Sequence, residues 1–343
     1  MKVGMTMKLV GKQSWVFGND IYIQARGTAV GPMEAKGPIG QKFDVTFSDL
    51  YCGEDTWELA ERRLMKEAIH VCLTKANADY NDIDLFLAGD LLNQNATANY
   101  TARDVPVPFL CMYGACSTSI ETLAVAAAFV DSGYAKTVLT ATSSHNATAE
   151  RQFRYPTGFG GQKPNSATFT VTGAGAALVS GKKSNIRITS ATIGRVVDYG
   201  IQNPFDMGTA MAPAAAATIK QHFRDLQTTP KEYDLIVTGD LSSVGSPILK
   251  QMLLEDGYDI SNNHNDCGLL IYHPDQDVFA GGSGCACCAV VTYGHLLKEM
   301  ERGKLKKILV VATGALLSPT MIRQNESIPG IAHGIVLEST RGG

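Results

Sequence analysis

The feature of this 343-residue sequence that most constrains its fold is an internal repetition of four blocks in the same order. The block that begins at Ile83, IDLFLAGDL, matches the block that begins at Tyr233, YDLIVTGDL. The block from Asp131, DSGYAKTVLTATSS, matches the block from Glu301, ERGKLKKILVVATGALLS. Each half also has a small-residue turn between these blocks and a glycine-containing apolar strand at its end. Chance matches rarely preserve the order of four blocks, so the sequence predicts two duplicated halves.

Both halves alternate apolar strand patterns with helical ones. In the first half, apolar residues recur at helical spacing from Trp57, with Asp55 as the expected N-cap, and an Ala-rich helix ends near Asp131. This alternation is typical of parallel sheets whose faces are covered by helices. We therefore expect a layered α/β structure built from halves 1–181 and 182–343.

Charge and hydropathy exclude several classes of protein. The 30 Lys and Arg residues are outnumbered by 33 Asp and Glu, which gives a formal net charge of −3. Binding to nucleic acid or to an anionic lipid surface favours a basic excess, so neither is expected. The sequence has no apolar run of roughly 18 residues, and MKVGMTMKLVGKQSW lacks the apolar segment of a signal peptide. We expect an intracellular protein.

The eight cysteines are expected to be reduced thiols, since no export signal accompanies them. Cys285, Cys287 and Cys288 lie close together, and His264 precedes Cys267 by three residues. A zinc site is the alternative, but paired C-x-x-C motifs are missing and the segment is rich in Gly and Ala. The sequence favours core thiols, with no metal site. The glycine-rich segments fit neither a P-loop nor a dinucleotide fingerprint, so no cofactor is expected.

One cysteine has a position that suits chemistry. Cys116 lies in the turn GACSTS, which follows a strand and opens the Ala-rich helix. The positive end of a helix dipole lowers the pKa of a thiol there, and the backbone N–H groups can hold an anion or a carbonyl oxygen. The alternative is a buried small residue in a tight turn.

The richest polar segment, SSHNATAERQFRYPTGFGGQKP, runs from Ser143 to Pro164 after a predicted strand. Loops at the carboxyl ends of such strands commonly bind ligands in α/β proteins. The segment offers donors, cations and flat apolar faces from His145, Asn146, Arg151, Arg154, Phe153 and Tyr155. A surface loop or a subunit contact is the alternative.

The duplicated halves and the GACSTS turn together resemble the thiolase superfamily, whose members condense or cleave acyl thioesters. The resemblance covers nearly the whole chain. It implies a thiolase-like fold, with two duplicated βαβαβ halves in an αβαβα arrangement, and places Cys116 at the position of the nucleophilic cysteine.

The other catalytic positions depart from that superfamily. Condensing enzymes have a His in a PHQAN-like motif, where this chain reads TGDLSSVGS, with Asp240 or Ser242 in its place. They also have an Asn in a GNTSAA-like turn, where this chain reads GGSGCA, with Gly282 and Ser283. A thioester enzyme needs those donors to stabilise an oxyanion and to move protons. We expect no catalysis; an acyl-thioester transferase that uses Cys116 is the alternative.

A second set of segments, dispersed from Gly11 to Ala289, is similar to the stage V sporulation protein AD family of spore-forming bacteria. The segments are GKQSWVF, AGDLLNQN, GACSTS, ATSSHNATAERQFRYPT, GGQKP, TGDLSSVGSP, HNDCGL and GGSGCAC. This similarity implies a non-enzymatic protein that binds dipicolinic acid and helps to move it into the forespore. It also implies a soluble subunit held peripherally at the inner membrane by other stage V sporulation A proteins. A structural subunit with a vestigial pocket is a third possibility.

Dipicolinate is a flat pyridine with two carboxylates, so its site should combine two anion-binding features with an apolar slot. Helix N-termini at Cys116 and near Cys285, with Arg151 or Arg154, are candidates for the first. For the calcium chelate, Asp90, Asp240 and Asp266 become candidate oxygen ligands, and the sequence leaves free acid and chelate open. The expected ligand-contacting residues are Cys116, His145, Asn146, Arg151, Arg154, Asp240, His264, Asp266 and Ser283. Replacing Arg151 with Ala is expected to weaken binding strongly.

We also expect a homodimer, since thiolase-like proteins usually pair across an edge strand beside the helix of the nucleophile. The segment SATFTVTG, residues 166–173, alternates apolar and polar side chains as a half-buried edge strand does. The alternative is an edge strand shielded within its own chain.

Overall fold

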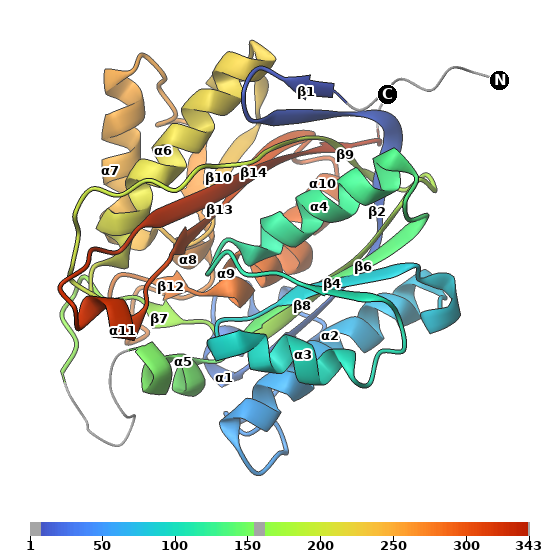
Figure 1. The fold of residues 1–343 in the computed structure, drawn as a ribbon, viewed down its shortest axis with the longest axis horizontal. Helices are drawn as coiled ribbons and strands as arrows, with labels where there is room; N and C mark the ends of the chain where they lie inside the picture. Colours follow the sequence, from blue (N-terminus) through green and yellow to red (C-terminus); the bar gives the residue numbers. More distant parts are fainter. Residues whose placement is uncertain (1–7, 154–161, 342–343) are drawn as a thin grey trace.

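A computed structural model describes residues 8–153 and 162–341 of the chain. Across these residues the main β-sheet has 12 strands, ten of which follow the order β11-β10-β13-β14-β9-β2-β8-β6-β4-β5 (Figure 1). The bounds of these ten, in that order, are His264–Asp266, Leu235–Thr238, Lys307–Ala315, Gly330–Ser339, Ile186–Thr192, Ser14–Val30, Gly173–Ser180, Thr137–Ser144, Leu85–Gly89 and Phe109–Cys111. The short strands β1 (Lys8–Val10) and β3 (Val45–Thr46) both pair with β2.

The strand order is symmetric about its centre, where β2 pairs antiparallel with β9. On one side lie β8, β6, β4 and β5, and on the other lie their counterparts β14, β13, β10 and β11. Each half of the chain thus supplies five strands in the same order, as the sequence repeat implies. The two halves meet along one continuous hydrogen-bonded ladder.

The sheet is mixed, which corrects the expectation of parallel sheets. The outer strands of each half are parallel: β4 pairs in parallel with β5 and β6, and β10 pairs in parallel with β11 and β13. The inner pairs, β6–β8 and β13–β14, are antiparallel. The outer parallel pairs need helical crossovers, whereas β8 and β14 run back antiparallel beside β6 and β13.

Helices cover both faces of each half-sheet. The three layers of helices and the two half-sheets together form five layers (Figure 1). One outer layer contains α2 (Trp57–Ala76), which packs on β2, β8 and β6, and α3 (Ala96–Ala102). The other contains α6 (Met207–Leu226), which packs on β13 and β14, and α7 (Ser242–Glu255). The middle layer contains α4 (Thr118–Ser132) and α9 (Cys285–Val291), and α4 contacts strands of both halves. Shorter helices are α1 (Pro32–Ala35), α5 (Asn146–Phe153), α8 (Cys267–Leu270), α10 (Leu297–Glu301) and α11 (Pro319–Ile322).

Local sequence explains the two helices that the pattern predicts best. The apolar stripe of α2 is buried, and its N-cap is Thr56, whose hydroxyl accepts from the N–H of Leu59 at 3.4 Å. The cap is therefore one residue later than the expected Asp55. Helix α4 is Ala-rich because it lies in the middle layer, where apolar strands approach it from both halves. Small side chains allow that close approach from two sides.

The segment predicted as a dimer edge has a partner inside the chain. Its strand β7 (Phe169–Thr170) pairs in parallel with β12 (Gly282–Ser283), and the N–H of Val171 donates to the carbonyl of Ser283 at 2.8 Å. Among the strands that the structure describes, β5 is an edge strand whose one partner in the main sheet is β4, and Leu110 on it is 47% exposed. Among the helices that the structure describes, none is both long and apolar enough to span a membrane.

Candidate functional site

The site is centred on Cys116, in the turn between β5 and α4. Ala115 adopts a left-handed backbone with φ of 51°, which turns the chain sharply before the helix begins at Thr118. Cys116 is buried, with a relative exposure of 6%. The backbone of β13 closes against this turn at Gly314, where a Cβ atom would lie 2.4 Å from the carbonyl oxygen of Gly114. The second half of the chain therefore forms one wall of the first half's turn.

Two other side chains meet Cys116 from the second half. Ser283 lies in β12, and its hydroxyl oxygen is 3.9 Å from the thiol sulfur of Cys116. The Ser283 hydroxyl donates to the carboxylate of Asp240 at 2.7 Å. Asp240 also accepts from the Thr313 hydroxyl at 2.6 Å and from the N–H of Gly284 at 3.0 Å. A hydroxyl and a buried carboxylate from the second half thus lie beside the thiol.

This environment keeps the thiol neutral. Burial raises the pKa of Cys116 well above its ordinary value, and the neighbouring carboxylate of Asp240 raises it further. The expectation of a pKa lowered by the helix dipole was wrong, because desolvation and a like charge both disfavour the thiolate. The Cys285 thiol donates to the carbonyl of Ala115 at 3.0 Å and sits beside the same turn.

Two backbone donors at the start of α9 are already used. The N–H of Gly284 donates to Asp240, and the N–H of Ala286 donates to the hydroxyl of Ser144 at 3.2 Å. These two donors therefore bind the protein's own side chains.

A small cavity of about 30 Å³ opens beside Cys116 and Ser283. Its walls are mainly apolar and consist of Leu91, Tyr113, Ala115, Ala149, Phe153, Thr170, Met207, Ala315 and Leu317, with Cys116 and Ser283. A volume of this size holds about two water molecules. Of the described residues that line it, none is a histidine or a cation.

A larger and more polar hollow of about 290 Å³ adjoins that cavity. Tyr113, Phe153 and Leu317 line both spaces, so these three side chains form the partition between them. The outer hollow adds a run of amide side chains, Asn93, Gln94 and Asn95, together with Leu92, Leu316, Ser318 and Pro319. The two spaces therefore lie on either side of a partition with two aromatic rings, the inner cavity beside the thiol and the outer hollow lined by amides.

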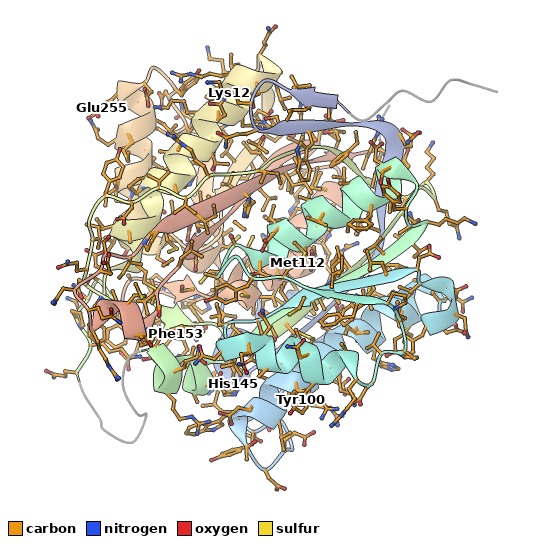
Figure 2. The ribbon with its side chains drawn as sticks, viewed as in Figure 1. Lys12, Tyr100, Met112, His145, Phe153 and Glu255 are labelled. Atoms are coloured by element: carbon orange, nitrogen blue, oxygen red, sulfur yellow. The ribbon has the colours of Figure 1, made fainter. Side chains whose placement is uncertain are left out.

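The structure places the predicted residues of the polar segment elsewhere in this region. The ring of His145 bridges the carbonyl of Leu50, 2.7 Å from Nε2, and the N–H of Ala147, 3.1 Å from Nδ1, so both its nitrogens are engaged (Figure 2). The N–H of Asn146 donates to the Thr172 hydroxyl at 3.0 Å, and the side-chain Nδ2 of Asn146 is buried without a partner in the described structure.

The guanidinium of Arg151 pairs with Glu58 and lies 5.5 Å from the centre of the Trp57 ring. It contacts the start of α2 and does not line the cavity. Arg154 and Tyr155 lie outside the described residues. Phe153, two positions after Arg151, is the member of α5 whose ring reaches the partition (Figure 2).

The remaining candidates bind backbone or side-chain groups within their own halves of the chain. Asp266 accepts from the N–H groups of Leu241, Ser242 and Gly268 at 2.9, 3.0 and 2.9 Å. His264 lies 3.0 Å from the Thr238 hydroxyl, and burial lowers its pKa to about 4. Asp90 accepts from the N–H groups of Leu92 and Ala98 at 2.8 and 2.7 Å. The described part of the chain contains no cluster of three or more ligating side chains that could hold a metal ion.

Of the nine expected residues, the structure brings Cys116, Asp240 and Ser283 together. Sequence reasoning missed Tyr113, Leu317 and the amide run at 93–95. One signal was available: these residues all follow strands at the edge of the sheet where parallel strands end, and that edge is where α/β proteins commonly bind ligands.

Comparison with solved structures identifies the fold. The chain matches 3-oxoacyl-[acyl-carrier-protein] synthase III from Aquifex aeolicus VF5 with a TM-score of 0.57 and 15% identity, over 93% of this chain and 99% of that one. It matches cerulenin-bound OleA of Xanthomonas campestris with a TM-score of 0.60 and 14% identity, over 94% and 98% of the two chains. These likenesses confirm the thiolase-like fold and say nothing of activity, because the identities are low.

Sequence comparison is more specific. The chain is 64% identical to stage V sporulation protein AD of Bacillus subtilis (strain 168) over 336 residues, which is 98% of this chain and 99% of that protein. The profile of the family described as Stage V sporulation protein AD matches residues 11–338. That description names a sporulation protein, whereas the solved structures include a synthase. The thiolase-like chain with a neutral, carboxylate-backed thiol at its centre therefore belongs to the stage V sporulation protein AD family.

Proposed function

We propose that this protein binds dipicolinic acid (pyridine-2,6-dicarboxylate) without catalysing a reaction, and that it serves dipicolinate uptake into the forespore. The observation that carries the proposal is the pair of adjoining spaces, an amide-lined hollow and the cavity at Cys116, with the Tyr113 and Phe153 rings between them. Membership of the family supports a role in sporulation. The two spaces offer aromatic rings and amide groups, which suit a flat dicarboxylate ligand.

The aromatic partition suits the ligand's ring. A flat heteroaromatic ring gains most from offset or edge contacts with other rings, and Tyr113 and Phe153 present such faces. Asn93 and Gln94 are exposed at the rim of the hollow, and their amide N–H₂ groups can donate to carboxylate oxygens. The inner cavity has room for about two water molecules. We therefore expect the pyridine ring of the ligand to lie between the Tyr113 and Phe153 side chains and to push one of these two side chains outward.

The thiol supports the non-catalytic part of the proposal. A nucleophile needs accessible thiolate, and burial together with Asp240 raises the pKa of Cys116 well above its ordinary value. A carboxylate beside the reacting carbon would also oppose a developing oxyanion. The second candidate, an acyl-thioester transferase, rests on the position of Cys116 at the helix turn and on the synthase-like fold.

The cellular role follows from the same proposal. We expect the protein to act in sporulation, and in germination, as a peripheral subunit at the forespore and spore inner membrane. There it would pass dipicolinate or its calcium chelate to other stage V sporulation A proteins. We also expect a homodimer, with its interface moved from 166–173 to the exposed edge strand β5.

Calorimetry of the purified protein tests the proposal. Dipicolinate, its calcium complex, isophthalate and acetyl-CoA are titrated separately into the protein. Dipicolinate is expected to bind, and isophthalate, which lacks the ring nitrogen, reports whether that atom contributes. Acetyl-CoA turnover at Cys116, or no binding of dipicolinate in either form, would overturn the proposal.

Two neighbouring substitutions in α5 locate the site. Phe153→Ala removes a ring from the partition and is expected to weaken dipicolinate binding about tenfold. Arg151→Ala is the matched control, because its guanidinium is held by Glu58 and Trp57. This expectation replaces the one drawn from sequence for Arg151. Equal affinities of both variants and the unmodified protein would move the site away from this partition.

A further inference from the structure

A second, larger hollow lies on the opposite end of α6 from the site just described. Its volume is about 640 Å³, within the range of small-molecule sites. Four elements surround it: the β1–β2 turn at Lys12, the segment 193–199 that follows β9, helix α6, and the C-terminal end of α7. Figure 2 shows Lys12 and Glu255 on the two sides of this region, with α6 between them.

The hollow concentrates positive charge on a chain whose net charge is −3. Four cationic side chains line it, namely Lys12, Arg195, Lys220 and Arg224. Lys220 pairs with Asp256 at 2.6 Å. Across residues 8–153 and 162–341, no ion pair forms at Lys12, Arg195 or Arg224. Three like charges around one hollow repel each other, and a bound anion would relieve that repulsion.

The nearby carboxylate of Asp225 is already used. It accepts from the backbone N–H groups of Lys12 and Gln13 at 3.1 and 3.0 Å, and from the side-chain amide of Gln221 at 2.6 Å. Its role is to hold the β1–β2 turn against α6. It therefore fixes the position of Lys12 without offering an ion pair to the guanidinium groups.

The walls are fixed in place before any ligand arrives. The N–H of Ile193 donates to the carbonyl of Gln13 at 2.9 Å, and Val197 exchanges two backbone hydrogen bonds, of 2.9 and 2.8 Å, with Gly330. The segment 193–199 is therefore tied to the β1–β2 turn at one end and to β14 at the other. A preformed site of this kind loses little conformational freedom on binding.

The floor between the cations is apolar. Pro213, Ala216, Ala217 and Met252 line it from α6 and α7. Tyr199, which is 66% exposed, stands at its rim. Two arginines can each donate a fork of hydrogen bonds to phosphate oxygens, and the apolar floor can take a ring or an acyl chain.

From this arrangement we propose that the hollow binds a phosphate ester that carries an apolar group, at a site separate from the one proposed for dipicolinate. Such an ester could be the headgroup region of an anionic phospholipid or a soluble organic phosphate, which share this chemistry. The site goes beyond the proposed function and does not depend on it.

Two probes distinguish the sources. The first is co-sedimentation of the full-length protein with phosphatidylcholine vesicles that contain or lack phosphatidylglycerol. The second is fluorescence titration with 1-naphthyl phosphate. Binding to the anionic vesicles alone assigns the site to lipid, and binding of naphthyl phosphate alone assigns it to soluble esters. Binding of neither probe overturns the proposal.

Matched variants connect the binding to this hollow. Arg195→Ala/Arg224→Ala is expected to weaken binding about tenfold or more, and added salt is expected to weaken binding by the unmodified protein. The control is Lys182→Ala/Lys183→Ala, which also removes two positive charges, but before the start of β9 and away from the hollow. It is expected to bind both probes as the unmodified protein does. Ala217→Leu fills the floor without a change of charge and should weaken binding of naphthyl phosphate. Equal loss in both double variants would overturn the proposal, and unchanged dipicolinate affinity would keep the two sites distinct.

Discussion

Asp240 accepts a hydrogen bond of 2.7 Å from Ser283, whose hydroxyl oxygen lies 3.9 Å from the sulfur of Cys116. The three residues belong to segments that are distant in the sequence and that come from both halves of the duplicated fold. Cys116 is therefore buried beside a carboxylate, and this environment raises the pKa of its thiol well above the ordinary value.

Asp240→Asn is expected to lower the pKa of Cys116 and to speed its alkylation, because a negative charge that opposes the thiolate is removed. The measurement is the rate of iodoacetamide labelling against pH. It is made in a Cys111→Ser background, because Cys111 is the exposed cysteine among the eight. Cys116→Ser in the same background identifies the labelled peptide. If the dependence of the labelling rate on pH is the same in Asp240→Asn as in the protein that keeps Asp240, then Asp240 does not raise the pKa of Cys116.

Gly314→Ala is expected to destabilise the protein by about 1–3 kcal/mol, because a Cβ there would lie 2.4 Å from the carbonyl oxygen of Gly114. Backbone on both sides leaves little room for relief. Gly334→Ala, in the neighbouring strand β14, is the control, because its Cβ would have its nearest contact at an ordinary 3.5 Å. Urea unfolding of both variants measures the difference. Similar midpoints would mean that the turn at Cys116 tolerates displacement.

Glu34 is expected to make the protein less stable as the pH rises from about 4.5 to about 7. Burial raises the pKa of Glu34 to about 7, although hydrogen bonds from the Tyr272 hydroxyl and the Thr172 N–H partly oppose that shift. The unfolded chain ionises first, near its ordinary value of 4.5, so stability present below that pH is lost as the pH rises toward the folded value.

Glu34→Gln is therefore expected to flatten the dependence of the free energy of unfolding on pH in that window. Ionisation of Glu34 is expected to change the free energy of unfolding by on the order of 3 kcal/mol between pH values below 4.5 and pH values above about 7. Denaturant unfolding at several pH values from 4.5 to 8 provides the measurement. Glu61, whose pKa burial raises to about 8, should keep part of the slope in the variant. A variant whose slope equals that of the unmodified protein would show that Glu34 ionises freely.

The chain is expected to form a dimer through the β5 edge, and Leu110→Lys should convert it to the monomer mass of 36.7 kDa. A charge on an exposed edge strand opposes strand pairing between copies. Leu254→Lys, at an exposed leucine on α7, is the matched control and should leave the dimer intact. Light scattering at micromolar protein measures both masses. If the unmodified protein already has the mass of a monomer, the predicted dimer is wrong.

The repeat in the sequence determined the larger part of the architecture. Blocks such as IDLFLAGDL and YDLIVTGDL predict strands because their apolar runs are short and end at glycine and an acid. Their shared order predicts two matching halves that contain strands in the same order, and the structure has five such strands in each half. The position of Cys116 at the start of a buried helix also followed from local residues alone. Patterns of this kind are properties of neighbouring residues, so they can be read without knowing the packing.

The packing decided what those residues do. Asp90 and Asp240 occupy the same GDL position of the repeat, yet Asp90 caps the loop before α3 and Asp240 lies behind the thiol. The partners of Asp90 are local, at Leu92 and Ala98, whereas those of Asp240, at Ser283 and Thr313, come from segments tens of residues away. No local pattern specifies the distant partners.

The rotation of α5 decided which side chain reaches the cavity. Arg151 and Phe153 are two residues apart, about 200° around a helix, so they cannot face the same way. The tertiary structure turns Phe153 toward Cys116 and Arg151 toward Glu58 and Trp57. The sequence supplied both side chains, but the choice between them depended on which face of the helix the rest of the fold left to the cavity.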